Sequence, residues 1–215
     1  LWGIVRVSAP MSFGIAHLAP LLPDFMRQYP DVELDVQFSD RCEDLVAERF
    51  DLALRIGNLQ DSSLLARQLV RVRILLVGSP DYFRQHGRPT HPSELAHHRA
   101  LQYAYSRSGA HWRFRHARHG EFSQAVPVAL RVNNAEGLEP ALLAGLGLAL
   151  QPEFLAWQPL RSGALESVMD DWEVASLALN IVTPPGRSRP ARVQRFIDHL
   201  AERMVQAPWA RDVQG

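Results

Sequence analysis

The chain has 215 residues, of which 47% are hydrophobic and 21% are charged. This length suits two small lobes that each bury a core, and the composition is typical of globular proteins rather than disordered or fibrous ones. Basic residues (Lys and Arg) and acidic residues (Asp and Glu) number 23 each, so there is no net positive charge to attract nucleic acid to this sequence.

The single cysteine, Cys42, excludes an internal disulfide and a cysteine-rich metal site, and it favours a cytoplasmic location. The sequence contains no signal peptide and no apolar run of about 18 residues, so we expect neither export nor a membrane partner. The first residue is Leu1 rather than methionine, and a strand-like pattern begins almost at once. We therefore expect the sequence to be a piece of a longer protein.

The first 57 residues predict strands and helices in alternation. We expect a helix that is kinked or restarted near Pro20, because proline removes a backbone hydrogen bond. The expected strands are 3–8, 32–38 and 50–57, and the expected helices are 15–29 and 42–48. Such alternation predicts a parallel sheet with crossover helices.

The remaining sequence predicts a second set of the same kind. Ser79 is expected to cap a helix that begins at Pro80, and Asn133-Asn134 to open a helix that runs to Leu146. Further strands are expected at 64–69, 72–77, 101–105, 112–114, 126–132, 148–150 and 177–182, with a helix after Pro152. The last helix, 193–204, carries one apolar stripe, and we expect it to dock on the first lobe.

Two strands are expected to cross between the lobes, one outward near residue 73 and one returning near residue 178. The predicted fold is therefore α/β, with two Rossmann-like lobes joined by two crossing strands. The expected first lobe comprises residues 1–72 and 178–215, and the expected second lobe comprises residues 73–177.

Five segments in order and spacing carry a resemblance to a known family. They are GIVRVSAPMSFG, HLAPLLPDFMRQYPDVELD, FDLALRIG, DSSLLARQL and ALLAGLGLALQP. Together they resemble the effector-binding domain of LysR-type transcriptional regulators, over nearly the whole chain. The resemblance implies the two-lobed fold of type 2 periplasmic-binding proteins, with a small-molecule effector held between the lobes.

The resemblance also implies partners for the parent protein. Promoter DNA would be bound only through an N-terminal winged helix-turn-helix, which is absent from this sequence. The sensor domains would pair as a homodimer, with a tetramer possible for the full-length protein, and we expect the apolar first helix and the helix Glu136–Leu146 to form the contacts. Effector binding would alter the oligomer that positions the DNA-binding domains.

Ligands of open parallel sheets bind beyond the carboxyl ends of the strands, next to helix N-termini. In the first lobe this predicts a site formed by Pro10, Met11, Ser12 and Phe13, with Arg55, Ile56 and Gly57 after a neighbouring strand. Helix N-termini and arginine both favour anions, so the expected effector is an organic anion. Ser12 could instead cap its helix, Phe13 could wall the site, and Arg55 could instead pair with Asp51 or Asp61.

In the second lobe the corresponding positions are Asn133 and Asn134, with Leu150 and Gln151 where the chain returns from the helix. One of the two asparagines is expected to cap the helix rather than to contact ligand.

No catalytic residue, metal site or cofactor is predicted. Cys42 lies beside two acidic residues, which disfavour a thiolate, and His111, His116 and His119 lack a recognisable zinc spacing. Alternation in 112–115 places the aromatic residues on one face of a strand and the arginines on the other, which explains this stretch without nucleic acid. The alternative to a regulator is the solute-binding protein of a transporter, which shares the implied fold.

Overall fold

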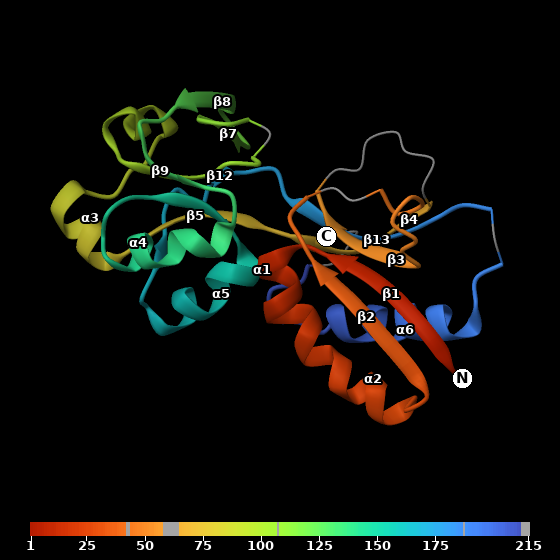
Figure 1. The fold of residues 1–215 in the computed structure, drawn as a ribbon. Helices are drawn as coiled ribbons and strands as arrows, with labels where there is room; N and C mark the ends of the chain where they lie inside the picture. The colour runs from red at the N-terminus through yellow and green to blue at the C-terminus, as the bar shows by residue number, and fades with distance from the viewer. Residues whose placement is uncertain (42–43, 58–64, 107, 187, 212–215) are drawn as a thin grey trace. The chain divides into compact units, whose positions relative to one another are not determined.

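The computed structural model describes residues 1–41, 44–57, 65–106, 108–186 and 188–211. The chain divides into two compact units, of which unit 1 comprises Leu1–Val72 and Leu177–Gly215 and unit 2 comprises Arg73–Ser176. Both units combine strands and helices (Figure 1), which confirms the predicted α/β class.

Unit 1 is built on a five-stranded sheet in the order β2-β1-β3-β13-β4. Strand β1 is parallel to both of its neighbours, as the alternating sequence pattern predicts, whereas β13 is antiparallel to both β3 and β4. The strands of this sheet are β1 (Gly3–Ala9), β2 (Val32–Phe38), β3 (Leu52–Ile56), β4 (Leu65–Val72) and β13 (Leu177–Thr183).

The first helical run of unit 1 is irregular, as the prolines predict. It consists of α1 (Met11–Phe13), the π-helix η1 (Gly14–Leu18), the 3₁₀-helix η2 (Ala19–Leu21) and α2 (Leu22–Gln28). Pro20 lies within the 3₁₀-helix. Because proline has no backbone N–H, it cannot donate an α-helical hydrogen bond, and its place outside the α-helical segments avoids that loss. A side chain at Gly14 would collide with the ring of Phe38, so the glycine lets the run start close to the end of β2.

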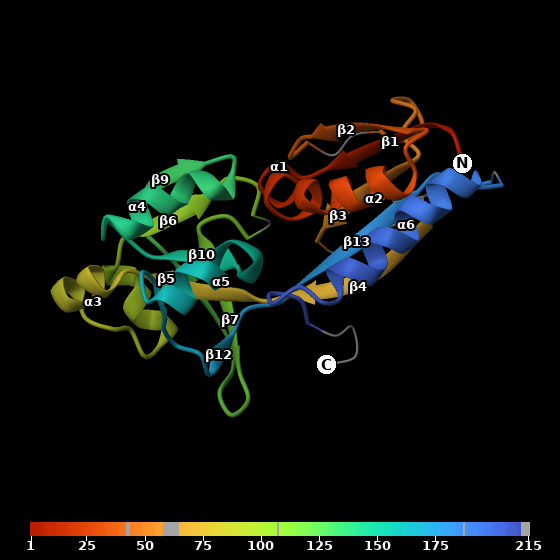
Figure 2. The same ribbon diagram turned by 90° about the horizontal axis from the view of Figure 1, so that it is seen from below.

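The last helix, α6 (Ala191–Met204), docks on unit 1 as expected and lies beside α2 along the sheet (Figure 2). Its apolar stripe is buried, and the ring of Phe196 meets that of Phe25 of α2 at 5.0 Å, edge to face. His199 on the same helix donates from Nε2 to the carbonyl of Leu21 at 2.7 Å. Burial lowers the pKa of His199, so this histidine is a neutral core residue.

The helix expected at 42–48 is wrong over the residues that the structure describes, because 45–49 form turns. Asp44 accepts hydrogen bonds at Oδ1 from the N–H groups of Val46 and Ala47, and its carbonyl accepts from Glu48. These bonds close one turn, and Arg49 then takes a left-handed conformation with φ of 58°, which ends it.

Unit 2 contains three small sheets with the strand orders β10-β5-β11, β12-β7-β8 and β6-β9. A bridge between Ala100 and Leu148 places β6 beside the start of β10, so the first and third of these sheets are continuous at that point. Their strands are β5 (Ile74–Gly78), β6 (Ala100–Tyr103), β9 (Val128–Val132), β10 (Ala149–Pro152) and β11 (Glu166–Ser167). The remaining strands are β7 (His111–His116), β8 (Gly120–Ala125) and β12 (Trp172–Glu173).

Three helical runs of unit 2 begin where the sequence predicts, whereas the 3₁₀-helix at Pro92–His97 was not predicted. Ser79 accepts from the N–H of Tyr82 and caps the helix that begins at Pro80, and a helical run follows Asn134. The helices are α3 (Pro80–His86), η3 (Pro92–His97), η4 (Ala135–Leu138), α4 (Glu139–Leu143) and α5 (Glu153–Ser162). Within the described part of the chain, no helix is both long and apolar enough to cross a membrane.

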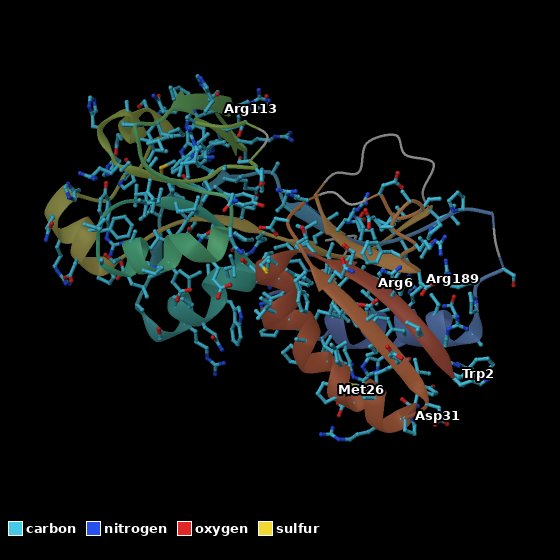
Figure 3. The ribbon with its side chains drawn as sticks, viewed as in Figure 1. Trp2, Arg6, Met26, Asp31, Arg113 and Arg189 are labelled. Atoms are coloured by element: carbon cyan, nitrogen blue, oxygen red, sulfur yellow. The ribbon has the colours of Figure 1, made fainter. Side chains whose placement is uncertain are left out.

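The β7–β8 hairpin confirms the predicted alternation of buried and exposed side chains. Trp112 and Phe114 are buried, whereas Arg113 (labelled in Figure 3) and Arg115 are exposed. Strand β8 is absent from the sequence prediction, because its six residues alternate without strongly apolar side chains except Phe122.

Candidate functional site

The carboxyl edge of the unit 1 sheet brings together both predicted groups of residues in that unit. Strands β1, β2 and β3 are parallel, so their carboxyl ends meet at one edge. Pro10–Phe13 follow β1, and Arg55–Gly57 end β3 and begin the next loop. Backbone bonding ties β1 to the chain after β2, because Ser39 N–H donates to the carbonyl of Ala9 at 2.8 Å.

The start of α1 already has one acidic neighbour. Met11 N–H donates to Oδ1 of Asp40 at 2.9 Å. Asp40 therefore places a negative charge beside the predicted anion site and occupies one donor of the helix start. Asp40 was not predicted as a site residue; its position just after β2, at the same sheet edge as Met11, is the signal that could have found it.

Ser12 is not the cap of its helix. The N-cap residue is Pro10, which has no side-chain acceptor, and Ser12 is the second helical residue, with 6% of its surface exposed. The alternative in which Ser12 serves as the N-cap is therefore wrong.

Phe13 belongs to the packing of unit 1. Its side chain is only 1% exposed, and its ring meets the ring of Trp209 edge to face at 5.4 Å and that of His17 at 5.6 Å. Trp209 also donates from Nε1 to Nδ1 of His17 at 3.1 Å. Phe13 thus anchors α1 against the C-terminal segment, and only its backbone is available to a site at the sheet edge.

The turn after β3 is held by the buried side-chain amide of Asn180. Gly57 has φ of 133°, which favours glycine, and its N–H donates to the carbonyl of Ala178 at 2.9 Å. Asn180 on β13 is 6% exposed and donates from Nδ2 to the carbonyls of Gly57, at 3.2 Å, and Ala178, at 3.3 Å. Asn180 is a positioning residue that the sequence analysis missed, because its role depends on the pairing of β13 with β3.

Arg55 is half-buried near the end of β3, opposite Asn180 in the strand register. Of the two aspartates considered as its partners, Asp51 accepts the backbone N–H of Arg6 at 2.8 Å through Oδ2. Asp61 lies outside the described residues, as does Cys42.

Unit 2 has a corresponding edge of its own. Strand β6 is parallel to β9, and the bridge between Ala100 and Leu148 is also parallel, so the carboxyl ends of β9, β6 and β10 share one edge. Asn134 caps η4 by accepting the N–H of Glu136 at 3.1 Å, which confirms that one of the two asparagines is a cap; Asn133 is exposed. Gln151 donates from Nε2 to the carbonyl of Ala135 at 3.3 Å, so it lies beside the start of η4.

Leu150 lies apart from Gln151 although the two are adjacent in sequence. Successive side chains of a strand point to opposite faces. Leu150 packs against the aromatic cluster that contains Trp112 and Phe114, whereas Gln151 is directed toward η4.

The histidine-rich segment forms an aromatic cluster around Trp172. His91, His116 and His119 have ring centroids 5.0, 4.8 and 6.1 Å from that of Trp172. Nδ1 of His116 accepts the backbone N–H groups of Arg118 and His119, which leaves Nε2 to donate to Asp171 at 3.2 Å. Among the residues that the structure describes, no group of three or more His, Cys, Asp or Glu side chains is arranged to hold a metal ion.

A tyrosine–histidine pair fixes α3 to the segment before β6. The hydroxyl of Tyr82 lies 2.6 Å from Nδ1 of His98, and the backbone N–H of Arg99 donates to the same hydroxyl at 3.3 Å. Burial raises the pKa of Tyr82 and lowers the pKa of His98, so both are neutral near pH 7 and the pair is a structural hydrogen bond.

Comparison with known proteins identifies relatives over almost the whole chain. The family model described as "LysR substrate binding domain" matches residues 2–205. An HTH-type transcriptional regulator of Xanthomonas campestris pv. campestris is 35% identical over 205 residues, which is 94% of this chain and 60% of that protein. The chain spans between 60% and 67% of the length of this regulator and of an uncharacterised HTH-type regulator of Haemophilus influenzae.

Solved structures match as well. The regulatory domain of CrgA, a LysR-type transcriptional regulator of Neisseria meningitidis, is 28% identical, with a TM-score of 0.82, and the match covers 94% of this chain and 98% of that domain. Full-length AphB, described as a virulence activator of Vibrio cholerae, is 28% identical with a TM-score of 0.83, over 94% of this chain and 68% of AphB.

Proposed function

The chain belongs to the family of LysR substrate binding domains, and from this premise we propose that the effector it senses is a small organic anion, contacted by residues at the carboxyl edge of unit 1. As the effector-binding domain of a LysR-type transcriptional regulator, the chain is related to HTH-type transcriptional regulators. That relationship supports ligand binding without catalysis, and a cytoplasmic location.

One observation carries the anion proposal. The helix start at Met11–Ser12 and the cationic Arg55 lie at the same sheet edge, after parallel strands. A helix N-terminus and a guanidinium both favour a carboxylate, and the Asp40 carboxylate partly offsets them. Pro10, Ile56, Gly57 and the backbone of Phe13 complete this set. In unit 2, Asn133 and Gln151 remain the proposed ligand contacts, whereas the side chain of Asn134 caps η4 and that of Leu150 packs in the aromatic cluster.

We expect a thermal-shift screen of small organic acids and aromatic metabolites to find a stabilising carboxylate. Arg55→Ala should weaken its binding about tenfold, because a hydrogen bond to a charged group contributes about 1.5–3 kcal/mol, and Ser12→Ala should weaken it less. Asp40→Asn should act in the opposite direction and tighten binding about two- to fivefold, because the amide oxygen can still accept from Met11 while the negative charge is removed. Isothermal titration calorimetry measures each dissociation constant.

The control variant is Arg27→Ala, which removes an arginine of unit 1 whose side chain is 75% exposed and paired with Asp24. It should leave the dissociation constant unchanged. Equal binding by Arg55→Ala, Asp40→Asn and the parent chain would contradict an anion site at this edge.

The proposal for the whole regulator includes a DNA-binding domain outside this sequence and self-association of the sensor domains. Exposed apolar side chains on or just after the two helical runs expected to pair support the second part; α4 ends at Leu143 rather than at Leu146 as expected, so Leu146 lies after the helix. Ile15 and Met26 (the latter labelled in Figure 3) are 50% and 53% exposed, and Leu143 and Leu146 are 44% and 54% exposed. Burial of such side chains favours association.

Sedimentation of the chain at increasing concentration should therefore show a dimer, and Ile15→Lys combined with Leu146→Lys should shift it to a monomer. Val46→Lys, at another apolar residue that is 62% exposed, should leave the dimer intact. A chain that stays monomeric throughout would contradict the proposed pairing.

A further inference from the structure

The Tyr82–His98 pair of unit 2 depends on a histidine nitrogen that accepts a hydrogen bond. The Tyr82 side chain is 1% exposed, and its hydroxyl oxygen accepts from the backbone N–H of Arg99 at 3.3 Å. Nδ1 of His98, at 2.6 Å, is the other partner of this hydroxyl among the described residues, so the hydroxyl hydrogen is donated to it. Burial raises the pKa of Tyr82 more than Arg99 lowers it, so the phenol keeps this hydrogen near neutral pH.

Protonation of His98 would break this arrangement. A protonated imidazole carries hydrogens on both nitrogens and accepts no hydrogen bond. Nδ1 could then only donate to the Tyr82 oxygen, and the hydroxyl hydrogen would have to turn away. That hydrogen has no other acceptor among the described residues, and a buried donor without an acceptor is costly. The bond as it stands therefore requires a neutral His98.

Most of the groups around His98 disfavour its charged form. Burial lowers the pKa of His98, and His86 of α3, whose ring is stacked on that of Tyr82, lowers it further. Of the two nearest groups on η3, Glu94 raises this pKa and His97 lowers it. The unfolded chain thus accepts a proton more readily than the folded chain. The resulting stability is complete above about pH 6.5, the usual histidine pKa, and is lost as the pH falls through the lower pKa of folded His98.

His199 of unit 1 shows what distinguishes His98 from another buried histidine. Burial lowers the pKa of His199 as well, but its Nε2 donates to the carbonyl of Leu21 at 2.7 Å. A proton added at Nδ1 of His199 leaves that bond in place. Of the two histidines, His98 is therefore the one whose protonation removes a hydrogen bond between two parts of the fold.

The pair joins α3 to the amino end of β6. The carbonyl of Arg99 accepts from the N–H of Leu148 at 2.8 Å, and the N–H of Leu101 donates to the carbonyl of Leu148 at 2.7 Å. The segment after His98 is thus fixed to the chain that leads into β10. Among the described residues, the hydrogen bonds that join α3 to this segment both involve the Tyr82 hydroxyl.

We propose that the Tyr82–His98 pair is a pH-sensitive switch of unit 2, which loosens α3 from the segment before β6 when His98 takes up a proton. Acid then acts on the sensor as a signal separate from its effector. The inference goes beyond the proposed function, because every residue that it uses belongs to unit 2 and it requires no ligand.

The first test compares Tm of the chain at about pH 7.5 and about pH 5.5, on either side of the usual histidine pKa, by circular dichroism. His98→Asn places an amide oxygen near the position of Nδ1, where it can accept from Tyr82 but is not protonated. On acidification its Tm should fall by about 2–4 °C less than that of the parent chain. The control His111→Asn, at an exposed histidine of unit 2, should show the parent's fall.

The second test locates the change by hydrogen exchange and mass spectrometry, corrected for the intrinsic effect of pH. At the acid pH the amides of α3 in the parent chain should exchange about fivefold faster relative to those of α5, a helix of the same unit without histidine. His98→Asn should remove this acceleration. His199→Gln should retain it, because its amide can still donate to Leu21. Tyr82→Phe, which lacks the hydroxyl, should show fast exchange in α3 at both pH values.

The inference is overturned if acid lowers Tm of His98→Asn as much as that of the parent chain, or if it accelerates exchange in α3 equally in both. Exchange in α3 that does not respond to acid in the parent chain also overturns it. If His98→Asn does not fold, Tyr82→Phe decides the question, since acid should not accelerate exchange in its α3 any further.

Discussion

Replacement of Trp209 by alanine is expected to lower the free energy of unfolding by about 3–5 kcal/mol, the range for a large aromatic side chain removed from a core. Trp209 is 2% exposed and packs against Phe13 and His17, to which its indole N–H also donates. The substitution removes this packing, leaves a cavity and frees the C-terminal segment from α1. Urea denaturation, followed by circular dichroism, measures the loss.

Trp2 provides the matched control, because its side chain is 80% exposed at the N-terminal end of β1 (Figure 3). Trp2→Ala should change the free energy of unfolding by no more than about 0.5 kcal/mol. Because Phe13 anchors α1, Trp209→Ala should also weaken binding of an anionic ligand at conditions where the chain remains folded. Equal stability of the two variants would show that the C-terminal segment is not packed on α1 in solution.

Replacement of Arg73 by alanine is expected to lower the free energy of unfolding by about 2 kcal/mol, because it leaves a buried carboxylate without its main partner. Arg73 donates from Nε and Nη2 to the two carboxylate oxygens of Glu153, both at 3.0 Å. The Glu153 side chain is 8% exposed, whereas that of Arg73 is 51% exposed, so solvent screening places the effect below that of a fully buried pair. Hydrogen bonding to Glu153 also raises the pKa of Arg73.

The double variant Arg73→Ala with Glu153→Gln should recover much of the loss, because the carboxylate is then neutral. Arg84→Ala serves as the control, since Arg84 pairs with Asp81 one helical turn away and both side chains are about 70% exposed. Its effect should stay within about 0.5 kcal/mol. An Arg73→Ala variant as stable as Arg84→Ala would show that the pair contributes nothing.

Much of the fold could be predicted from local patterns. Alternation of apolar residues located β2, the apolar stripe located α6, and Ser79 before Pro80 located the start of α3. These signals are local, so one sequence suffices to find them. Strand β8 and the turns after Asp44 were not predicted, because the first depends on pairing with β7 and the second on a left-handed residue, Arg49.

The candidate site could be predicted only in outline. The rule that ligands bind at the carboxyl ends of parallel strands correctly predicted that Ser12 and Arg55 lie at one edge of the sheet. The groups that modify this edge come from distant parts of the chain, namely Asp40 after β2 and Asn180 on β13. Their positions follow from strand pairing, which no local pattern contains.

The position of β13 between β3 and β4 affects how the protein folds during its synthesis on the ribosome. Unit 2 is one continuous segment, Arg73–Ser176, whereas unit 1 needs β13 from beyond it to join β4 to the rest of its sheet. During synthesis unit 2 can therefore complete its fold before β13 is available to pair with β4. The edges of β3 and β4 stay unpaired through this interval, so nascent chains of this protein are most exposed to chaperones and to aggregation just before Leu177–Thr183 emerges.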